Sequence, residues 1–358
     1  MKKMINEKFQ LKTAKRRVVA LTMALLVLLS GCLSGCGNTG EKRNSAGGVV
    51  SEISEENKLV IYTAHKEEIY KPIIREFERR TGIWVEVVSG GTSEMLEMIK
   101  NEREESPENS KADIMFGGGV DSLMLYEDCF EPYVTTQADK LDDTYASEGN
   151  YYTVFSKLPV VFIYNTKFLL RSGAPMNWEQ FIDSGFSNDI AFADPQKSGS
   201  SLTILSFLVQ HLEKKGISTE DVIKGFCRNL NGSLSKGSDT VFTDVNKGDK
   251  AVGITLEETA LKNIKENSDV EIVYPKDGTC ALPDGCAIVK GANHRENAEK
   301  FMEFVVCDDV QHLLEDELCR RSVRKDFESN LISGEEKYDL KYFQENKEKL
   351  IELWRENL

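Results

Sequence analysis

The chain alternates short apolar segments with amphipathic ones, and this alternation limits the folds available to it. Residues 58–63 (KLVIYT) form an apolar run, and residues 66–81 then place Ile69, Ile73 and Phe77 at helical spacing. The pattern continues with expected strands at 83–88 and 113–116 and an expected helix at 93–103. Because strand and helix alternate at the interval of βαβ units, we predict an α/β fold with a largely parallel sheet flanked by helices.

A second block repeats the α/β pattern after residue 159. Its expected strands lie at 160–164, 191–193, 251–254 and 270–273, and its leucine-rich helix lies at 200–215. A last section, with a strand at 286–290 and a helix at 296–306, is expected to cross back to the first block. We therefore predict two lobes and the domains 1–36 (leader), 37–57 (tether), 58–158 (first lobe), 159–278 (second lobe) and 279–358 (return to the first lobe and C-terminal helices).

The charge balance of the chain is acidic. Its 358 residues carry 45 Lys and Arg against 59 Asp and Glu, a formal net charge of −14. Nucleic acid is therefore not expected as the main partner, since phosphate backbones require clustered cations. Hydrophobic residues make up 40% of the chain. This content excludes a disordered protein, and the length allows each lobe a core of its own.

The first 36 residues have the pattern of a secretory leader. Basic residues precede residues 18–29 (VVALTMALLVLL), an apolar run too short for an ordinary membrane span of about 20 residues. LSGC follows twice, ending at Cys32 and at Cys36, and both copies resemble the lipobox of bacterial lipoproteins. The resemblance implies lipidation of Cys32 or Cys36, and an uncleaved anchor is the alternative. With a flexible tether at 37–57, we expect a protein that is exported and lipid-anchored to the outer face of the cytoplasmic membrane.

Six cysteines follow the leader, at Cys129, Cys227, Cys280, Cys286, Cys307 and Cys319. An exported chain can pair its cysteines, and Cys280 and Cys286 flank the turn-like residues 281–285 (ALPDG). Buried free thiols are the alternative. The sequence has no CxxC pair and its four histidines show no metal-ligand spacing, so neither a metal nor a cofactor is expected.

Seven segments, in order, carry a family pattern. They are LVIYTAH (59–65), EFERRTGIWVEVV (76–88), DIMFGGG (113–119), AFADPQKSGSS (191–201), AVGITLEE (251–258), PDGCAIVKGA (283–292) and RRSVRKD (320–326). Together they resemble the bacterial solute-binding proteins of ATP-driven uptake systems, in the group of ferric-ion, thiamine, aminoethylphosphonate and hexose-phosphate binders. The resemblance covers about residues 57–327. It implies a two-lobed periplasmic-binding-protein fold of type II, hinge closure on a ligand in the cleft, and delivery to an ABC permease and its ATPase.

Residues 194–201 (DPQKSGSS) follow an expected strand and open an expected helix. Amides at a helix start bind oxyanions, and neighbouring hydroxyls add donors. Ordinary helix capping by Ser198 or Ser200 is the plainer interpretation. The candidate ligand-binding residues here are Asp194, Ser198, Gly199, Ser200 and Ser201.

The first block offers similar groups after its strands, at the ends where ligands of such sheets bind. The candidates are Thr63, His65, Gly91, Thr92, Gly118 and Asp121. For His65, a surface or capping role is the alternative. With donors on both walls, a small anionic solute that bears a phosphate or phosphonate is the expected ligand.

In ferric members of the family, neighbouring tyrosines hold the metal in the segment corresponding to residues 251–259. This chain has Glu257 and Glu258 there and no tyrosine, so iron held by tyrosinate is not expected. Glu257 is the candidate for hydroxyl groups or an amine of the ligand, with a solvated helix start as the alternative. In the basic cluster of residues 320–324, Arg321 is the candidate for gripping a phosphate, with a solvated surface as the alternative.

The sequence contains no GxSxG, Walker or HExxH motif, so the chain is not expected to be an enzyme. Phosphoester hydrolysis by His65 with Glu257 or Asp194 explains neither the two blocks nor the tether. Two alternatives to phosphate uptake stay open. One is a ferric-ion or thiamine binder of the same fold, and the other is a ligand sensor that engages a membrane histidine kinase.

Overall fold

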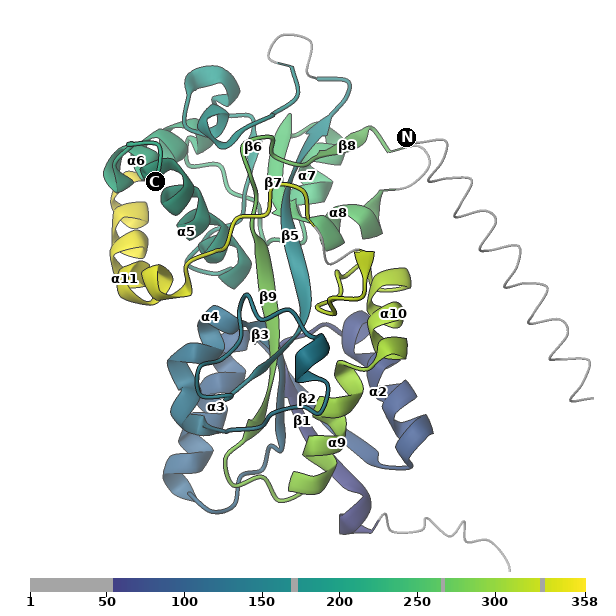
Figure 1. The fold of residues 1–358 in the computed structure, drawn as a ribbon. Coiled ribbons are helices and arrows are strands. Elements are labelled where there is room, and N and C mark those ends of the chain that lie inside the picture. The colour runs from purple at the N-terminus through teal and green to yellow at the C-terminus, as the bar shows by residue number, and fades with distance from the viewer. Residues whose placement is uncertain (1–53, 169–172, 265–267, 329–331) are drawn as a thin grey trace, which may run out of the picture. The chain divides into compact units, whose positions relative to one another are not determined.

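A computed structural model describes residues 54–168, 173–264, 268–328 and 332–358 (Figure 1). The leader, both lipobox cysteines and nearly all of the expected tether lie outside the described residues. The described strands form a nine-stranded sheet in the order β2-β1-β3-β9-β5-β7-β6, with β4 beside β9 and β8 beside β5. Their bounds are β1 Lys58–Thr63, β2 Trp84–Ser89, β3 Ile114–Gly119, β4 Phe130–Glu131, β5 Thr153–Asn165, β6 Ile190–Ala191, β7 Val252–Leu256, β8 Val270–Val273 and β9 Ala281–Val289.

Helices surround the sheet in two groups, which together with their strands make two lobes (Figure 1). The first lobe contains α2 (Glu67–Thr81), α3 (Thr92–Glu105), α4 (Val120–Leu123), α9 (Arg295–Val305) and α10 (Asp308–Asp316). The second lobe contains α5 (Gly199–Glu213), α6 (Thr219–Leu230), α7 (Val241–Lys247), α8 (Glu257–Asn263) and α11 (Leu340–Asn357). This is the two-lobed α/β architecture that the sequence predicts.

Two long strands, β5 and β9, run through both lobes. The first half of β5 pairs with β9, from Thr153 opposite Cys286 to Pro159 opposite Ala281. The second half of β5 pairs with β7 and β8 in the second lobe. β9 also pairs with β3, which places the end of this strand in the first lobe. The lobes therefore share their two central strands.

The sheet is parallel only in part. β1 pairs in parallel with β2 and β3, as the alternation of the first block predicts. In the second lobe β6 and β7 are parallel, but β5 is antiparallel to both β7 and β8. The second lobe thus departs from the mostly parallel sheet expected for each lobe. β5 carries the chain into the second lobe and β9 carries it back, so their antiparallel pairing follows from the crossing itself.

The turn expected at residues 281–285 is wrong, because these residues belong to the strand β9. Cys280 and Cys286 are separated by six positions of extended chain, about 20 Å. A disulfide needs Cα atoms within about 7 Å, so these two cysteines cannot pair. All six cysteines in the described part of the chain are free.

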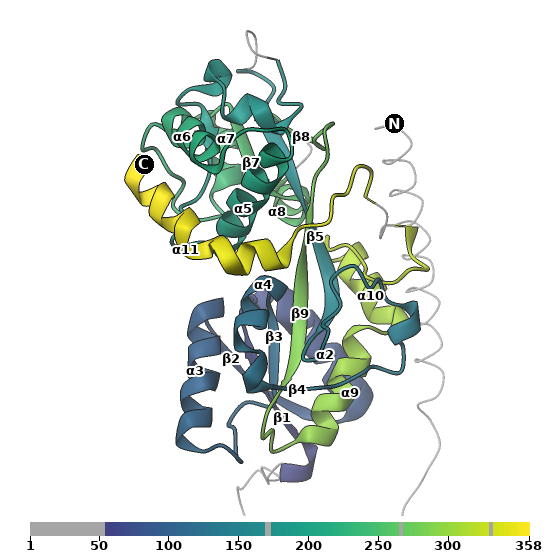
Figure 2. The same ribbon diagram turned by 60° about the vertical axis from the view of Figure 1, so that its left-hand side comes forward.

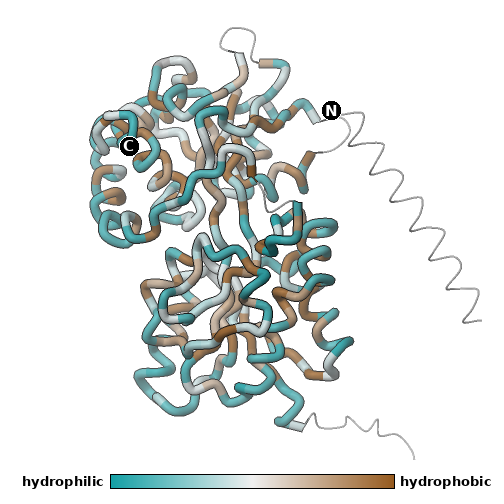
Figure 3. Tube along the Cα trace, in the orientation of Figure 1, coloured by the Kyte–Doolittle hydropathy of each residue, from teal (hydrophilic) through white to brown (hydrophobic). Residues whose placement is uncertain are grey.

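Hydrophobic segments lie mainly in the interior of each lobe, and hydrophilic residues lie on the outer turns of the helices (Figure 3). In the first lobe Phe77 packs edge-on against Phe301 at a ring distance of 5.1 Å. In the second lobe Trp354 of α11 lies 6.2 Å from both Phe192 and Phe226 and is fully buried. The C-terminal helix is therefore part of the second lobe, where it lies across α5 and α6 (Figure 2). Among the described helices, none combines the length and apolar character needed to cross a membrane.

Candidate functional site

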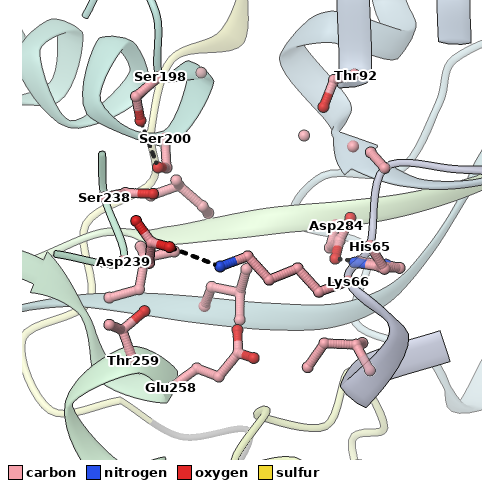
Figure 4. Close-up of a pocket in the computed structure, with 18 of the residues that line it drawn as sticks. His65, Lys66, Thr92, Ser198, Ser200, Ser238, Asp239, Glu258, Thr259 and Asp284 are labelled. Carbon is pink, nitrogen blue, oxygen red and sulfur yellow. Dashed lines mark hydrogen bonds and ion pairs between the residues drawn. The ribbon is translucent and has the colours of Figure 1, made fainter. Parts of the chain in front are cut away.

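A pocket of about 600 Å³ lies where the two lobes face each other (Figure 4). Its first wall comes from the ends of β1 and β3 and the starts of α2, α3 and α4, and its opposite wall from the starts of α5 and α8 and the loop before α7. The shared strands contribute Leu158, Leu282, Pro283 and Asp284, and Arg320 joins them from the segment after α10. The pocket therefore lies at the carboxyl ends of β1 and β3, where α/β sheets bind ligands.

Two long helices begin at this pocket from opposite lobes. α3 starts at Thr92, after Gly91, and α5 starts at Gly199, after Ser198. The Ser198 hydroxyl accepts the N–H of Ser201 at 3.3 Å, so it caps α5. The first-turn N–H groups of a helix have no acceptor within the helix itself, and the helix dipole adds partial positive charge there. Both walls thus present donors suited to an anion.

Two glycines at the end of β3 allow the first wall to form. Gly117 and Gly118 have φ values of +87° and +98°, a backbone conformation that side chains rarely adopt. A Cβ on Gly117 would lie 2.3 Å from Nε2 of His65, and one on Gly118 would lie 2.9 Å from Cγ2 of Thr92. The glycines therefore leave room for the His65 and Thr92 side chains at the pocket.

A buried charged cluster forms the floor of the pocket. The Arg320 guanidinium donates to the Asp284 carboxylate through Nη1 and lies 3.4 Å from Glu258 Oε2 through Nη2. The Nη1 atom also donates to the Ser156 hydroxyl at 2.9 Å. Nε2 of His65 lies 3.4 Å from Oδ2 of Asp284 (Figure 4). One guanidinium is thus shared between two carboxylates beside an imidazole.

The surroundings of this cluster shift the pKa values of its members. Burial raises the pKa of Asp284 to about 6, although Arg320 opposes the shift. Burial, with the nearby Arg320 charge, lowers the pKa of His65 well below its ordinary value, so its imidazole is neutral. Burial also acts to raise the pKa of Glu258, but Arg320 and Lys262 outweigh it and the pKa is lowered. Glu258 is therefore ionised, whereas Asp284 titrates close to neutral pH.

Two contacts join the walls directly. Thr203 of α5 donates its hydroxyl to Oδ2 of Asp121, whose Oδ1 accepts the N–H of Ser122 at 2.7 Å. Asp121 is 5% exposed, and its burial raises its pKa. At the other edge, Nζ of Lys66 lies 2.9 Å from Oδ2 of Asp239, and both side chains are well exposed (Figure 4). The first link is buried and the second is open to solvent.

Eight of the residues selected from the sequence line this pocket: His65, Gly91, Thr92, Gly118, Asp121, Ser198, Gly199 and Ser200. Three others lie outside its lining because their side chains are engaged nearby. Thr63 donates its hydroxyl to the carbonyl of Phe116 at 2.7 Å. Asp194 accepts the N–H of Gln196, and Ser201 bonds with the Ser198 hydroxyl at 3.0 Å.

Glu257 and Arg321 also lie outside the pocket lining, because they pair with each other. Nε and Nη2 of Arg321 each donate to a Glu257 oxygen at 2.7 Å, and Tyr274 donates to the same carboxylate. Their sequence neighbours Glu258 and Arg320 line the pocket instead. Successive helix positions differ in direction by about 100°, so adjacent glutamates at the start of α8 point to different sides.

Sequence reasoning did not select several polar residues that line the pocket. They are Lys66, Glu68, Ser122, Lys197, Thr203, Ser238, Asp239, Glu258, Thr259, Lys262, Asn263, Asp284 and Arg320. Asp284 was not selected because residues 281–285 were expected to form a turn. Its position just before the strand expected at 286–290 could have identified it as a candidate. Asp239 follows no motif, and only the tertiary structure brings it to Lys66, 173 positions away.

Comparison with known proteins agrees with the fold and with the resemblance seen in the sequence. The family model described as bacterial extracellular solute-binding protein matches residues 109–335. A putative 2-aminoethylphosphonate-binding periplasmic protein of Salmonella typhi is 26% identical over 241 residues, which cover 66% of this chain and 68% of that protein.

Two solved structures show the same two-lobed fold. One is the periplasmic binding protein AfuA of Actinobacillus pleuropneumoniae with fructose 6-phosphate bound, at a TM-score of 0.71 and 22% identity over 84% of this chain and 98% of that one. The other is a ferric binding protein of Campylobacter jejuni, at a TM-score of 0.72 and 22% identity, which covers 84% of this chain and 99% of that one. The predicted fold class and family are both confirmed, and the chain belongs to the bacterial extracellular solute-binding proteins.

Proposed function

We propose that this protein captures a small solute bearing a phosphate or phosphonate in the pocket between its lobes and delivers it to an ABC permease and its ATPase. One observation carries the proposal: the starts of α3 and α5 face the same pocket from opposite lobes. Each start adds hydroxyl groups, from Thr92 on one side and from Ser198 and Ser200 on the other (Figure 4). A phosphate group offers several oxygens and can accept from both walls at once.

The composition of the pocket argues against ferric ion held by tyrosinate. The described residues that line the pocket include no tyrosine. Tyr274, the tyrosine nearest in sequence to Glu257 and Glu258, donates to Glu257 outside the lining. A ferric-ion or thiamine binder of the same fold remains the alternative that the binding experiment below decides.

The two walls also supply the mechanism of closure. A ligand favours the closed form only to the extent that it binds that form more tightly than the open one. A solute that bonds with the start of α3 and the start of α5 meets this condition, because opening the lobes removes one set of bonds. The shared strands β5 and β9 are then the hinge.

The place of action and the partners form part of the same proposal. Lipidation of Cys32 or Cys36 holds the protein at the outer face of the membrane, and residues 37–57 let the lobes reach the permease. The segment boundaries at 58–158 (first lobe), 159–278 (second lobe) and 279–358 (return to the first lobe and C-terminal helices) are proposed with it, with α11 of the last segment packed on the second lobe. A sensor role beside a histidine kinase is the second candidate, and loss of solute uptake in a deletion strain distinguishes transport from sensing.

Isothermal calorimetry tests the ligand class. Fructose 6-phosphate, 2-aminoethylphosphonate, inorganic phosphate, thiamine and ferric citrate are titrated into the purified protein. We expect at least one phosphorus compound to bind with micromolar Kd or tighter, about −8 kcal/mol. Ferric binding with a tyrosinate absorption band, together with no heat from any phosphorus compound, overturns the proposal.

A further inference from the structure

Asp284 lies among ionisable groups that come from several parts of the chain. Arg320, from the segment after α10, and His65, from the loop before α2, contact Asp284 directly. Glu258 and Lys262 of α8 belong to the same network, because Glu258 pairs with Arg320 and Lys262 pairs with Glu258. On its own strand, Cys286 carries a buried thiol whose pKa is raised by burial and by the Asp284 charge. Asp284 itself is 4% exposed and lines the pocket.

The basic side chains that line the pocket are all paired with carboxylates. Each of the four described ones already has a carboxylate within 4 Å: Lys66 with Asp239, Lys197 with Asp194, Lys262 with Glu258, and Arg320 with both Asp284 and Glu258. An anion that enters therefore adds uncompensated negative charge next to a buried carboxylate. Such a charge is costly in a buried site unless a partner or a proton neutralises it.

His65 provides a hydrogen-bond acceptor for a proton carried by Asp284. Its Nε2 atom is buried and has no hydrogen-bond partner among the described residues, although Oδ2 of Asp284 lies 3.4 Å away. Two acceptors face each other here when the imidazole carries its proton on Nδ1 and the carboxylate is ionised. A proton on the Asp284 carboxyl turns this contact into a donor and acceptor pair.

Building on the proposed function, we propose that a phosphate-bearing solute enters the pocket together with one proton from the solvent, and that this proton binds to the Asp284 carboxylate and stays there as a carboxyl O–H that hydrogen-bonds to Nε2 of His65. Arg320 then keeps Glu258 as its charged partner and directs its remaining charge at the solute. Asp284 is thereby a specificity-determining residue, because it adjusts the charge of the pocket floor to that of the ligand. The pKa of Asp284, about 6 because of burial, lets the proton bind near neutral pH.

The expected signature is proton uptake on binding. Where one proton is taken up, the apparent Kd for the solute rises up to tenfold for each unit of increasing pH. Fructose 6-phosphate is titrated into the full chain at pH 7.5 in two buffers of different ionisation heat, since the dependence of the binding heat on the buffer counts protons. We expect the wild type to take up about one proton more than Asp284→Asn.

Subtracting the proton count of Asp284→Asn from that of the wild type removes the contribution of the solute's own phosphate, because this contribution is the same for both proteins. Glu102→Gln serves as the matched control, since Glu102 is a buried carboxylate bonded to Tyr62 and lies outside the pocket lining. This variant is expected to keep the wild-type proton count. Fructose, which lacks the phosphate, is expected to cause no uptake if it binds.

A second measurement uses the wild type alone, in case Asp284→Asn does not fold. Infrared difference spectra are expected to gain the carbonyl band of a protonated carboxyl when the solute is added at pH 7.5. Binding without extra proton uptake and without this band overturns the inference and leaves the proposed function intact. If neither fructose 6-phosphate nor 2-aminoethylphosphonate binds at any pH from 5 to 8, the proposed function and this inference fail together.

Discussion

Two neighbouring arginines meet two neighbouring glutamates in this protein, yet the two pairs lie in different surroundings. Arg321 and Glu257 share two hydrogen bonds of 2.7 Å outside the pocket lining. Arg320 and Glu258 are 3.4 Å apart, line the pocket and include Asp284 in their network. The first pair, which we call the clasp, is bonded within itself and to Tyr274, away from the pocket. The second pair belongs to the floor, the cluster of Arg320, Glu258, Asp284 and His65 described above, and its charged groups line the pocket.

The clasp and the floor therefore place different demands on the chain. The clasp fixes the start of α8 to the segment that follows α10, so it holds parts of the two lobes at one distance. The floor keeps a group that titrates near neutral pH, which is costly for the fold and useful for binding. We expect changes in the clasp to lower stability with little effect on affinity, and changes at the pocket to alter ligand affinity as well as stability.

The largest expected effect comes from Glu257→Ala in the clasp. The substitution leaves Arg321 partly buried without its carboxylate, and loss of one partner of a buried pair costs about 4 kcal/mol in the free energy of unfolding. Urea unfolding measures this loss, and calorimetry is expected to show less than about a threefold change in solute Kd. The double variant Glu257→Ala/Arg321→Ala should recover part of the stability. A stable variant with strongly weakened binding would instead assign Glu257 to the ligand.

The second prediction concerns the floor and the pH dependence of stability. The pKa of Asp284 in the folded protein, about 6, lies above its ordinary value of 3.8. The stability contributed by its protonated form is thus complete below pH 4 and is lost as the pH rises through 6. A shift of this size corresponds to about 3 kcal/mol. The unfolding free energy of the wild type should fall by about this amount relative to Asp284→Asn between pH 4 and pH 7, and parallel pH curves would contradict it.

These two sites also show how far sequence reasoning reaches. Apolar alternation predicts β1, α2, β2 and α3, and the strand followed by a serine-rich helix start predicts the capped end of α5, because local patterns determine each of them. The sequence pattern does not predict whether Glu257 or Glu258 faces the pocket. That choice depends on how the short helix α8 is rotated about its axis, which the tertiary structure determines. Asp284 lies in a stretch typical of turns, but pairing with β3 and β5 on its two sides makes it a strand.

The third prediction compares two capping serines of the second lobe. Ser198 caps α5 at the pocket, whereas Ser218 caps α6 by accepting the N–H of Asp221, outside the lining. Replacing either by Ala should cost about 1 kcal/mol of unfolding free energy. Only Ser198→Ala is expected to weaken binding of fructose 6-phosphate or 2-aminoethylphosphonate as well, by about 1 to 2 kcal/mol, because a charged acceptor loses a donor. Equal affinities of the two variants would remove the start of α5 from the ligand site.

The smallest effect is expected for Lys66→Ala, which removes a pair that spans the pocket without being buried. Lys66 and Asp239 are 2.9 Å apart, but their side chains are 63% and 61% exposed. Water and salt screen such a pair, so we expect a contribution of about 0.5 kcal/mol to the closed form, roughly a twofold change in its population. Energy transfer between dyes on the two lobes measures that population without ligand.

Salt supplies the internal check on this last effect, because at 1 M ionic strength the screening length falls to about 3 Å. The wild type in high salt should then match Lys66→Ala in low salt. Lys167→Ala is the matched control, since Lys167 pairs with Asp269 at 2.6 Å within the second lobe and is also well exposed, at 68%. If Lys66→Ala lowers the population of the closed form several-fold, the exposed pair contributes more than a solvent-screened pair should. The expectation that the buried clasp is strong and the exposed Lys66–Asp239 pair is weak would then be wrong.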